Sequence, residues 1–265
     1  MRVLETGTFR ERIGSGLAGL ALFAAALLLT GCTMDRPGGP ATDARPAGSR
    51  AAEVDCGGGE PDTKRVYWGD LHVHTAYSLD AYGYGTIQTP ADAFRFAKGQ
   101  RIDLPSGPVQ LARPLDFMAV TDHAEWLDLM FTCTEPGFSS HPVCRNLRAK
   151  SSQATGSSIF KELVNPTITG PKPEPTELCK DDPKACIAAR DNQWARAQRH
   201  ANEANQPCRF TAFIGFEWSA TPGASHTHRN VIFANEHATA FPIDYIRYPR
   251  VSELWDALVR QCRPE

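Results

Sequence analysis

The sequence predicts an α/β fold with parallel strands, either layered or closed into a barrel. Apolar runs of strand length alternate with segments of helical composition, and polar side chains follow the ends of the predicted strands. With 42% hydrophobic and 22% charged residues in 265 positions, the chain can also bury a substantial core. These observations together indicate a globular α/β domain.

The first elements of this domain are predicted from residue 64 onward. Residues 66–74 have a β-rich composition and should form a strand. A helix is predicted over 90–99, because Thr89 can cap it, a proline occupies its first turn and a glycine ends it. Residues 115–121 have the length of a buried parallel strand, and a helix should follow from Ala124.

The second half of the domain begins with an insertion. Residues from about 133 to 182 are rich in Pro, Ser and Gly, so we expect an insertion with one helix near 159–164. Four elements should follow, namely a long helix over 183–205, a strand over 210–218, a strand over 230–235 and an amphipathic helix over 251–262. No strand follows that last helix, so the sequence predicts that the domain of residues 64–265 is incomplete at its C-terminus.

The N-terminus has the pattern of a bacterial lipoprotein signal peptide. An apolar stretch follows two arginines, and Leu29-Thr30-Gly31-Cys32 resembles a lipobox, which implies a signal peptide over 1–31 and lipidation of Cys32. A transmembrane anchor is the alternative, although roughly 13 apolar residues are fewer than the ~20 that span a bilayer. Residues 32–63 are rich in Pro, Gly and Ala, and predict a flexible tether.

The cysteine content predicts an oxidising compartment. Eight cysteines are many for a reducing cytosol. With the lipobox, this predicts a lipid-anchored protein of the bacterial cell envelope, on the periplasmic side of the inner or outer membrane. The spacing leaves connectivity open, but the pairs that we expect are Cys133 with Cys144, Cys179 with Cys186, and Cys208 with Cys262. Zinc binding by these thiols is less favoured, because the chain has no close Cys-x-x-Cys pair.

The charge balance argues against nucleic acid as the main partner. The net charge is −2, and basic residues form no stripe of the kind that binds phosphate backbones. A small or anionic substrate would therefore be held by a local site.

Candidate metal ligands occur at or just beyond the ends of the predicted strands. They are His72, His74, Asp80, Asp122, His123, Glu217 and His228. The carboxyl ends of parallel strands meet on one face, so we expect these residues to converge. Alternating side chains of a strand place His72 and His74 on the same side, and a carboxylate such as Glu217 can bridge two ions. The mixture of imidazole and carboxylate favours Zn, Mn or Fe over Ca.

Each of these residues also has a purely structural interpretation. A His-x-His pair can be a coincidence, and Asp122 can be a helix N-cap that is followed by an ordinary loop histidine, His123. Glu217 can be paired with a cation or exposed. Only the combination favours a metal site.

The order of the motifs resembles that of a known superfamily. The polymerase and histidinol phosphatase (PHP) superfamily has similar successive motifs, found here in residues 69–75 with Ser78 and Asp80, residues 120–123, residues 214–217, and His228. The group catalogued as domain of unknown function 3604 resembles the chain most, in residues 67–78, 89–93, 216–218 and 228–233.

The resemblance implies the N-terminal part of a distorted (β/α)7 barrel, with two or three divalent transition-metal ions at its mouth. The implied ligands are His72, His74, Asp80, His123, Glu217 and His228, with Glu217 as the bridge. Asp122 would orient an imidazole or a water molecule. His226 is a weaker candidate than His228, because His228 leads directly into a strand as in the family pattern. Further ligands that the superfamily carries downstream, a His and an Asp-x-His, have no match here.

The implied activity is hydrolysis of a small anionic ester, of the phosphoester type, by a metal-activated water. Arg229 follows a ligand and would bind a substrate oxygen, since its planar guanidinium suits phosphate, or else it is a solvated strand-edge residue. The alternative function is a non-catalytic envelope module whose metal site is vestigial or structural.

Overall fold

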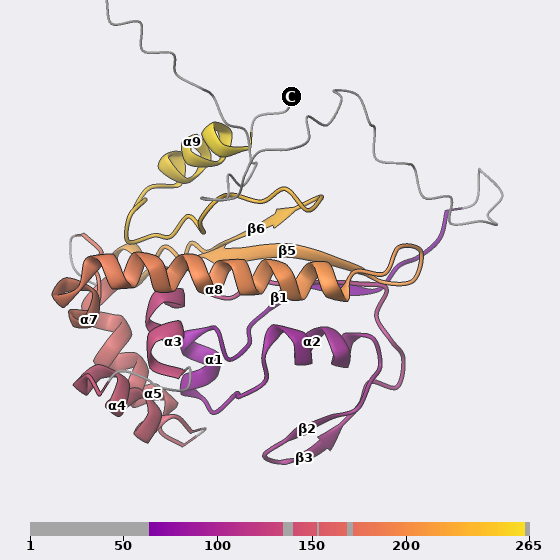
Figure 1. The fold of residues 1–265 in the computed structure, drawn as a ribbon, viewed down its shortest axis with the longest axis horizontal. Helices are drawn as coiled ribbons and strands as arrows, with labels where there is room; N and C mark the ends of the chain where they lie inside the picture. The colour runs from indigo at the N-terminus through magenta and orange to yellow at the C-terminus, as the bar shows by residue number, and fades with distance from the viewer. Residues whose placement is uncertain (1–63, 135–139, 153, 169–171, 263–265) are drawn as a thin grey trace, which may run out of the picture.

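The computed structural model describes residues 64–134, 140–152, 154–168 and 172–262 (Figure 1). The predicted signal peptide, the tether and Cys32 lie outside these ranges. Over the described ranges the fold is mixed α/β, as predicted. In this part of the chain, no helix has the length and apolar character needed to cross a membrane.

A four-stranded sheet lies at the centre, in the order β1-β4-β5-β6. The strands β1 (Gly69–Val73), β4 (Phe117–Val120) and β5 (Thr211–Trp218) run parallel to one another. By contrast, β6 (Arg229–Phe233) runs antiparallel to β5, so the expectation of parallel strands is wrong for β6. The connection over 219–228 is shorter than the dozen or so residues that a parallel crossover needs, so the chain returns as an antiparallel neighbour.

The described strands form an open sheet with β1 and β6 at its edges. The closed (β/α)7 barrel is not seen within the described ranges. Beside β1, the side chains of Tyr67, Trp68 and Leu71 are exposed. The edge of the sheet at β1 therefore leaves large apolar side chains exposed.

The expected helix after Thr89 is present as α2 (Pro90–Ala97). Thr89 and Asp92 form a capping box, in which each side chain accepts a hydrogen bond from the backbone N–H of the other. Gly99 follows at φ +76°, a conformation that suits glycine at the end of a helix. The helices predicted over 183–205 and 251–262 agree within a residue with α8 (Pro183–Ala204) and α9 (Val251–Gln261).

The core lies between α8 and the sheet. Figure 1 shows α8 running alongside β5, and α8 also packs against α2 and α3 (Leu127–Thr134). Trp194 of α8 is buried, with ring centroids 5.6 Å from Phe216 and 6.2 Å from Phe233. Its Nε1–H donates to the backbone carbonyl of Thr239 at 2.8 Å. The longest helix is thus fixed to the strand that carries Glu217.

The insertion contains more helices than expected. A single helix was predicted near 159–164, and that stretch is a π-helix, η2 (Phe160–Val164). The other helices of the insertion are α4 (Pro142–Lys150), α5 (Gly156–Ile159), α6 (Asn165–Ile168) and α7 (Glu177–Asp181). Two disulfides, Cys133–Cys144 and Cys179–Cys186, join α3 to α4 and α7 to α8, which confirms both local pairs.

The third expected disulfide is wrong. Cys208 is disulfide-bonded, but its partner is not Cys262. The disulfides indicate a protein that matures outside the reducing cytosol.

Several short elements were not predicted. A hairpin of β2 (Ile102–Leu104) and β3 (Gly107–Val109) stands apart from the main sheet, at the foot of Figure 1. The other unpredicted short helices are α1 (Leu79–Gly83) and η3 (Pro222–Ala224). The helix expected from Ala124 begins as the short helix η1 (Ala124–Trp126) and continues as α3. Of these, α1 and η1 begin directly beside candidate ligands.

Candidate metal centre

The sheet brings six of the seven candidate ligands together at one end. His72, His74 and His123 lie at or just beyond the carboxyl ends of the parallel strands β1 and β4. Glu217 lies in β5, Asp80 in the first turn of α1, and His228 directly before β6. The antiparallel course of β6 is what places His228 here, because the start of β6 lies beside the end of β5. A backbone bridge between His123 and Glu217 extends the pairing of β4 with β5 to the site itself.

Glu217 is the centre of this cluster. Its Oε1 is 3.4 Å from His72 Nε2 and 3.0 Å from His228 Nδ1. Its Oε2 is 3.4 Å from His74 Nε2 and 2.9 Å from His123 Nδ1. The Glu217 side chain is only 1% exposed. Four imidazole rings therefore converge on one buried carboxylate, and each carboxylate oxygen faces two of them.

Asp80 supplies a second carboxylate on the opposite side of two of these rings. Its Oδ1 is 3.4 Å from His74 Nδ1, and its Oδ2 is 3.3 Å from His123 Nε2. The rings of His74 and His123 thus lie between Asp80 and Glu217. Each of the two rings presents one nitrogen to each carboxylate.

The spacing of these atoms fits divalent transition-metal ions. Zn–N bonds of about 2.0–2.1 Å place two ligands about 3.0 Å apart at a right angle and about 3.4 Å apart at the tetrahedral angle. The Nε2 atoms of His72 and His74 are 2.9 Å apart, and each is 3.4 Å from an oxygen of Glu217. These three residues form one group with the spacing of a metal site, and His74, Asp80 and His123 form another.

The charges of the site depend on one another. Burial would raise the pKa of Glu217 and of Asp80, but hydrogen bonds with the histidines outweigh burial and hold both pKa values well below the usual range. Burial would lower the pKa of His123, but its hydrogen bonds to Asp80 and Glu217 raise that pKa to about 10. Both carboxylates are therefore ionised at neutral pH, and in the absence of a cation His123 retains a proton between them.

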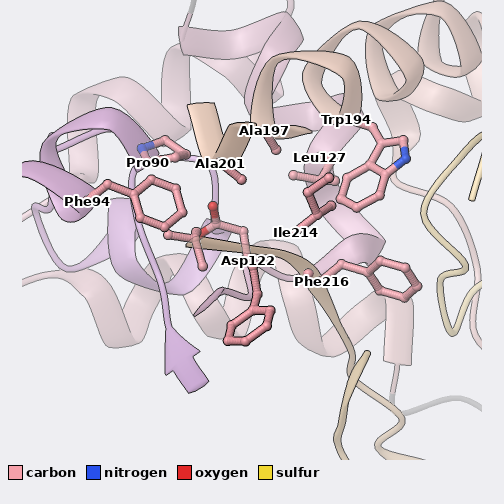
Figure 2. Close-up of a pocket in the computed structure, with 12 residues that line it drawn as sticks. Pro90, Phe94, Asp122, Leu127, Trp194, Ala197, Ala201, Ile214 and Phe216 are labelled. Carbon is pink, nitrogen blue, oxygen red and sulfur yellow. The ribbon is translucent and has the colours of Figure 1, made fainter. Parts of the chain in front are cut away.

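Asp122 lies beneath the cluster and not in it. Figure 2 shows its carboxylate among Phe94, Leu127 and Ile214, in an apolar pocket between α8 and the sheet. The carboxylate accepts hydrogen bonds from the Thr75 backbone N–H at 2.6 Å and from the Thr75 hydroxyl at 2.8 Å. Burial raises the pKa of Asp122 to about 6, although these hydrogen bonds oppose the rise. Asp122 therefore fixes the loop after His74, and it is not among the residues that line the ligand cavity.

Arg229 and His226 lie close to His228 in the chain, but only His226 reaches the cavity. The Nη1 of Arg229 donates to the backbone carbonyls of Thr227 at 3.2 Å and His228 at 2.8 Å, and Arg229 is not among the residues that line the cavity. His226 does line it, with its Nδ1 3.4 Å from His228 Nε2. His226, which the sequence favoured less than His228, thus lies next to the candidate ligands.

The ligands open into a cavity of about 250 Å³. Besides the histidines and the two carboxylates, its walls are formed by Trp126, Ile168, Ser219 and Thr221. Ser219 was not among the predicted site residues, yet its Oγ lies 2.5 Å from His123 Nδ1 and 3.3 Å from Glu217 Oε2. A signal for it was present, because alternate residues of a strand face the same side and Ser219 follows Glu217 by two. Ile168 comes from the insertion, where nothing in the sequence indicated proximity to the site.

A third group of potential ligands lies in the insertion, formed by Asp128, Cys179 and Cys186. The two cysteines form a disulfide, so their sulfurs are not available as thiolate ligands. This agrees with the preference for disulfides over zinc-binding thiols.

Comparison with known proteins identifies a family for the chain. The family described as "Protein of unknown function (DUF3604)" matches residues 61–264, a range that includes every candidate ligand. Neither the curated proteins nor the solved structures contain a match to the chain.

Proposed function

The chain belongs to the DUF3604 family of proteins of unknown function, and we propose that it is a metal-dependent hydrolase of phosphoester-type bonds. The observation that carries the proposal is the position of Glu217. A buried carboxylate that faces four imidazole nitrogens at 2.9 to 3.4 Å can hold two divalent ions side by side. The similarity of the motifs to those of the PHP superfamily supports the same conclusion.

Two ions can be assigned to the donor atoms. One would be held by His72 Nε2, His74 Nε2 and Glu217 Oε1 or Oε2. The other would be held by His123 Nδ1 and His228 Nδ1, which face Glu217 at 2.9 and 3.0 Å, so that Glu217 would be shared between the two ions. Asp80 faces the opposite nitrogens of His74 and His123 and would hold these two rings from the other side. The soft-to-borderline imidazoles and the hard carboxylates suit Zn, Mn or Fe.

Such ions, when bound, supply Lewis acidity for an ester oxygen and make a water molecule nucleophilic near neutral pH. The protein's own part is to hold the donors in place and to shape the cavity. Trp126 and Ile168 give that cavity an apolar wall, which restricts access of bulk water to the reacting bond. The substrate that fits best is a small anionic ester, with Arg229, next to His228 in the chain, available to an ester oxygen that projects outward.

We expect hydrolysis to depend on metal. Full-length protein freed of metal by a chelator should hydrolyse p-nitrophenyl phosphate and bis-p-nitrophenyl phosphate at least about 100-fold more slowly than protein resupplied with Zn or Mn, because the ions activate the nucleophile. The measurement is release of p-nitrophenolate. Equal rates in both forms would contradict the proposal. Metal binding without hydrolysis of any ester tested would favour the alternative of a non-catalytic envelope module.

Metal binding should strengthen as the pH rises. The pKa of His123 is raised to about 10, so below that pH the ring carries a proton that must leave when a cation binds through it. Release of one proton makes the affinity about tenfold tighter per pH unit, and we expect this slope between about pH 6.5 and 8.5. Competition titrations with a zinc chelator measure it, after correction for the chelator's own protonation. An affinity that does not change with pH would show that His123 does not bind the ion.

We also propose that the chain is anchored to the periplasmic side of a bacterial membrane by lipid on Cys32. The disulfides and the lipobox-like sequence support this proposal. A Cys32→Ser variant should move from the membrane fraction to the soluble fraction, and a variant that stays in the membrane fraction would rule out the lipid anchor.

A distorted (β/α)7 barrel remains our proposal for the complete architecture. The exposed Tyr67, Trp68 and Leu71 beside β1 support it, because a further strand would cover them. An experimental structure that leaves β1 at the edge of an open sheet would contradict it.

A further inference from the structure

Ser78 stands between two candidate ligands and has a hydrogen-bonding pattern unusual for its position. It is the N-cap residue of α1, with extended backbone angles of φ −100° and ψ 130°. A serine there ordinarily accepts a hydrogen bond from the first turn of its helix. The Ser78 side chain makes no such bond. Its hydroxyl is therefore available for another partner.

The hydroxyl contacts His74 and His123 instead. Its Oγ lies 2.7 Å from His74 Nδ1 and accepts a hydrogen bond from the His123 backbone N–H at 3.0 Å. Ser78 is fully buried, so water does not compete for these contacts. One oxygen atom thus links a ligand after β1 to a ligand after β4.

We propose that Ser78 is a positioning residue that holds His74 in the tautomer that binds metal, an inference that rests on the proposed metal centre. An imidazole has one protonated and one unprotonated nitrogen when neutral, and only the unprotonated nitrogen can bind an ion. When His74 Nδ1–H donates to the Ser78 oxygen, Nε2 carries the lone pair. His74 Nε2 is the atom that faces His72 and Glu217.

The same contact fixes the orientation of the ring. The backbone N–H of His123 holds the Ser78 oxygen in place, and that oxygen then holds the His74 ring. Metal-binding histidines commonly donate their second nitrogen to such a partner, and loss of the partner lowers metal affinity by roughly 10- to 100-fold. Ser78 would supply this partner from a helix N-cap, because its Oγ lies 2.7 Å from His74 Nδ1, closer than Asp80 Oδ1 at 3.4 Å.

The test compares Ser78→Ala with Thr89→Ala in the full-length protein. Thr89 is a matched control, because it is also an N-cap residue, it does cap its helix, and within the described residues its side chain bonds to Asp92 and not to a site histidine. Zinc affinity is measured by chelator competition, and the tautomer of His74 in the zinc-loaded protein by long-range 15N–1H NMR. We expect Ser78→Ala to bind zinc roughly 10- to 100-fold more weakly and to lose the single protonated Nδ1 of His74, whereas Thr89→Ala keeps both.

The outcomes separate this inference from the proposed function. If the wild-type protein binds zinc and Ser78→Ala binds it equally well with His74 unchanged, the role of Ser78 is wrong and the metal centre stands. If both variants lose affinity to the same extent, the effect is structural and the inference fails. If the wild-type protein binds no zinc, both proposals fail.

Discussion

Glu217→Gln should abolish binding of both metal ions. The substitution keeps the size of the side chain, but it replaces one oxygen with an amide NH2, and the four imidazoles lose the anion on which they converge. Loss of a residue that only supports a ligand costs roughly 10- to 100-fold in affinity, so loss of a shared ligand should cost at least about 100-fold for each ion. Isothermal titration with zinc measures the loss.

Asp128→Asn is the matched control for this change. Asp128 is also a buried carboxylate, it lies in α3 next to the site, and its Oδ1 accepts from the Leu129 backbone N–H. No contact joins it to the site histidines in the described residues. We expect Asp128→Asn to bind zinc as the wild type does. Equal zinc affinity in wild type and Glu217→Gln would contradict the central position of Glu217.

Trp194→Ala should cost about 3–5 kcal/mol of unfolding free energy, the usual range for a buried tryptophan. The ring is 1% exposed and packs on Phe216 and Phe233, and its indole N–H binds the Thr239 carbonyl. The substitution removes that apolar contact, leaves a cavity between α8 and β5, and leaves the Thr239 carbonyl without its donor. Urea unfolding followed by circular dichroism measures the change.

Trp255→Ala removes the same side chain at an exposed position. Trp255 lies in α9 and is 50% exposed, so we expect a change of no more than about 0.5 kcal/mol. A similar loss of stability in the two variants would mean that α8 does not form the core against the sheet.

The convergence of the candidate ligands was largely predictable because these residues follow a general rule of α/β folds. His72, His74 and His123 stand at the carboxyl ends of parallel strands, which meet on one face. Their convergence on Glu217 is the arrangement that the sequence indicated. His228 reaches the same place by a different route, because β6 is antiparallel. The length of the β5–β6 connection was visible in the sequence and would have predicted that direction.

The roles of Asp122, Ser78 and Ser219 were harder to predict, because they depend on side-chain direction. Asp122 precedes a ligand in the sequence but turns into the core, where it binds Thr75. Ser78 has the sequence position of a helix cap, and only the structure shows its hydroxyl on His74. Local spacing does not distinguish these alternatives.

The missed elements are those whose stability comes from tertiary contacts. The helices α4 to α7 are short, and isolated helices of this length are unstable in water, so their sequences carry a weak signal. Two disulfides fix this region to α3 and α8. In the β2–β3 hairpin, Pro108 argues against a strand, but a two-stranded ribbon leaves one side of each strand without partners and tolerates a missing N–H.

The most direct test of the account is the metal content of the full-length protein. The chain is incubated with Zn, Mn and Fe, dialysed, and measured by inductively coupled plasma mass spectrometry beside a His72→Ala, His74→Ala double variant. The account predicts two or more transition-metal ions per wild-type chain, as expected for ions that share a carboxylate, and a loss of at least one in the variant. No stoichiometric metal in the wild-type protein would contradict the proposed metal centre and the hydrolytic function built on it.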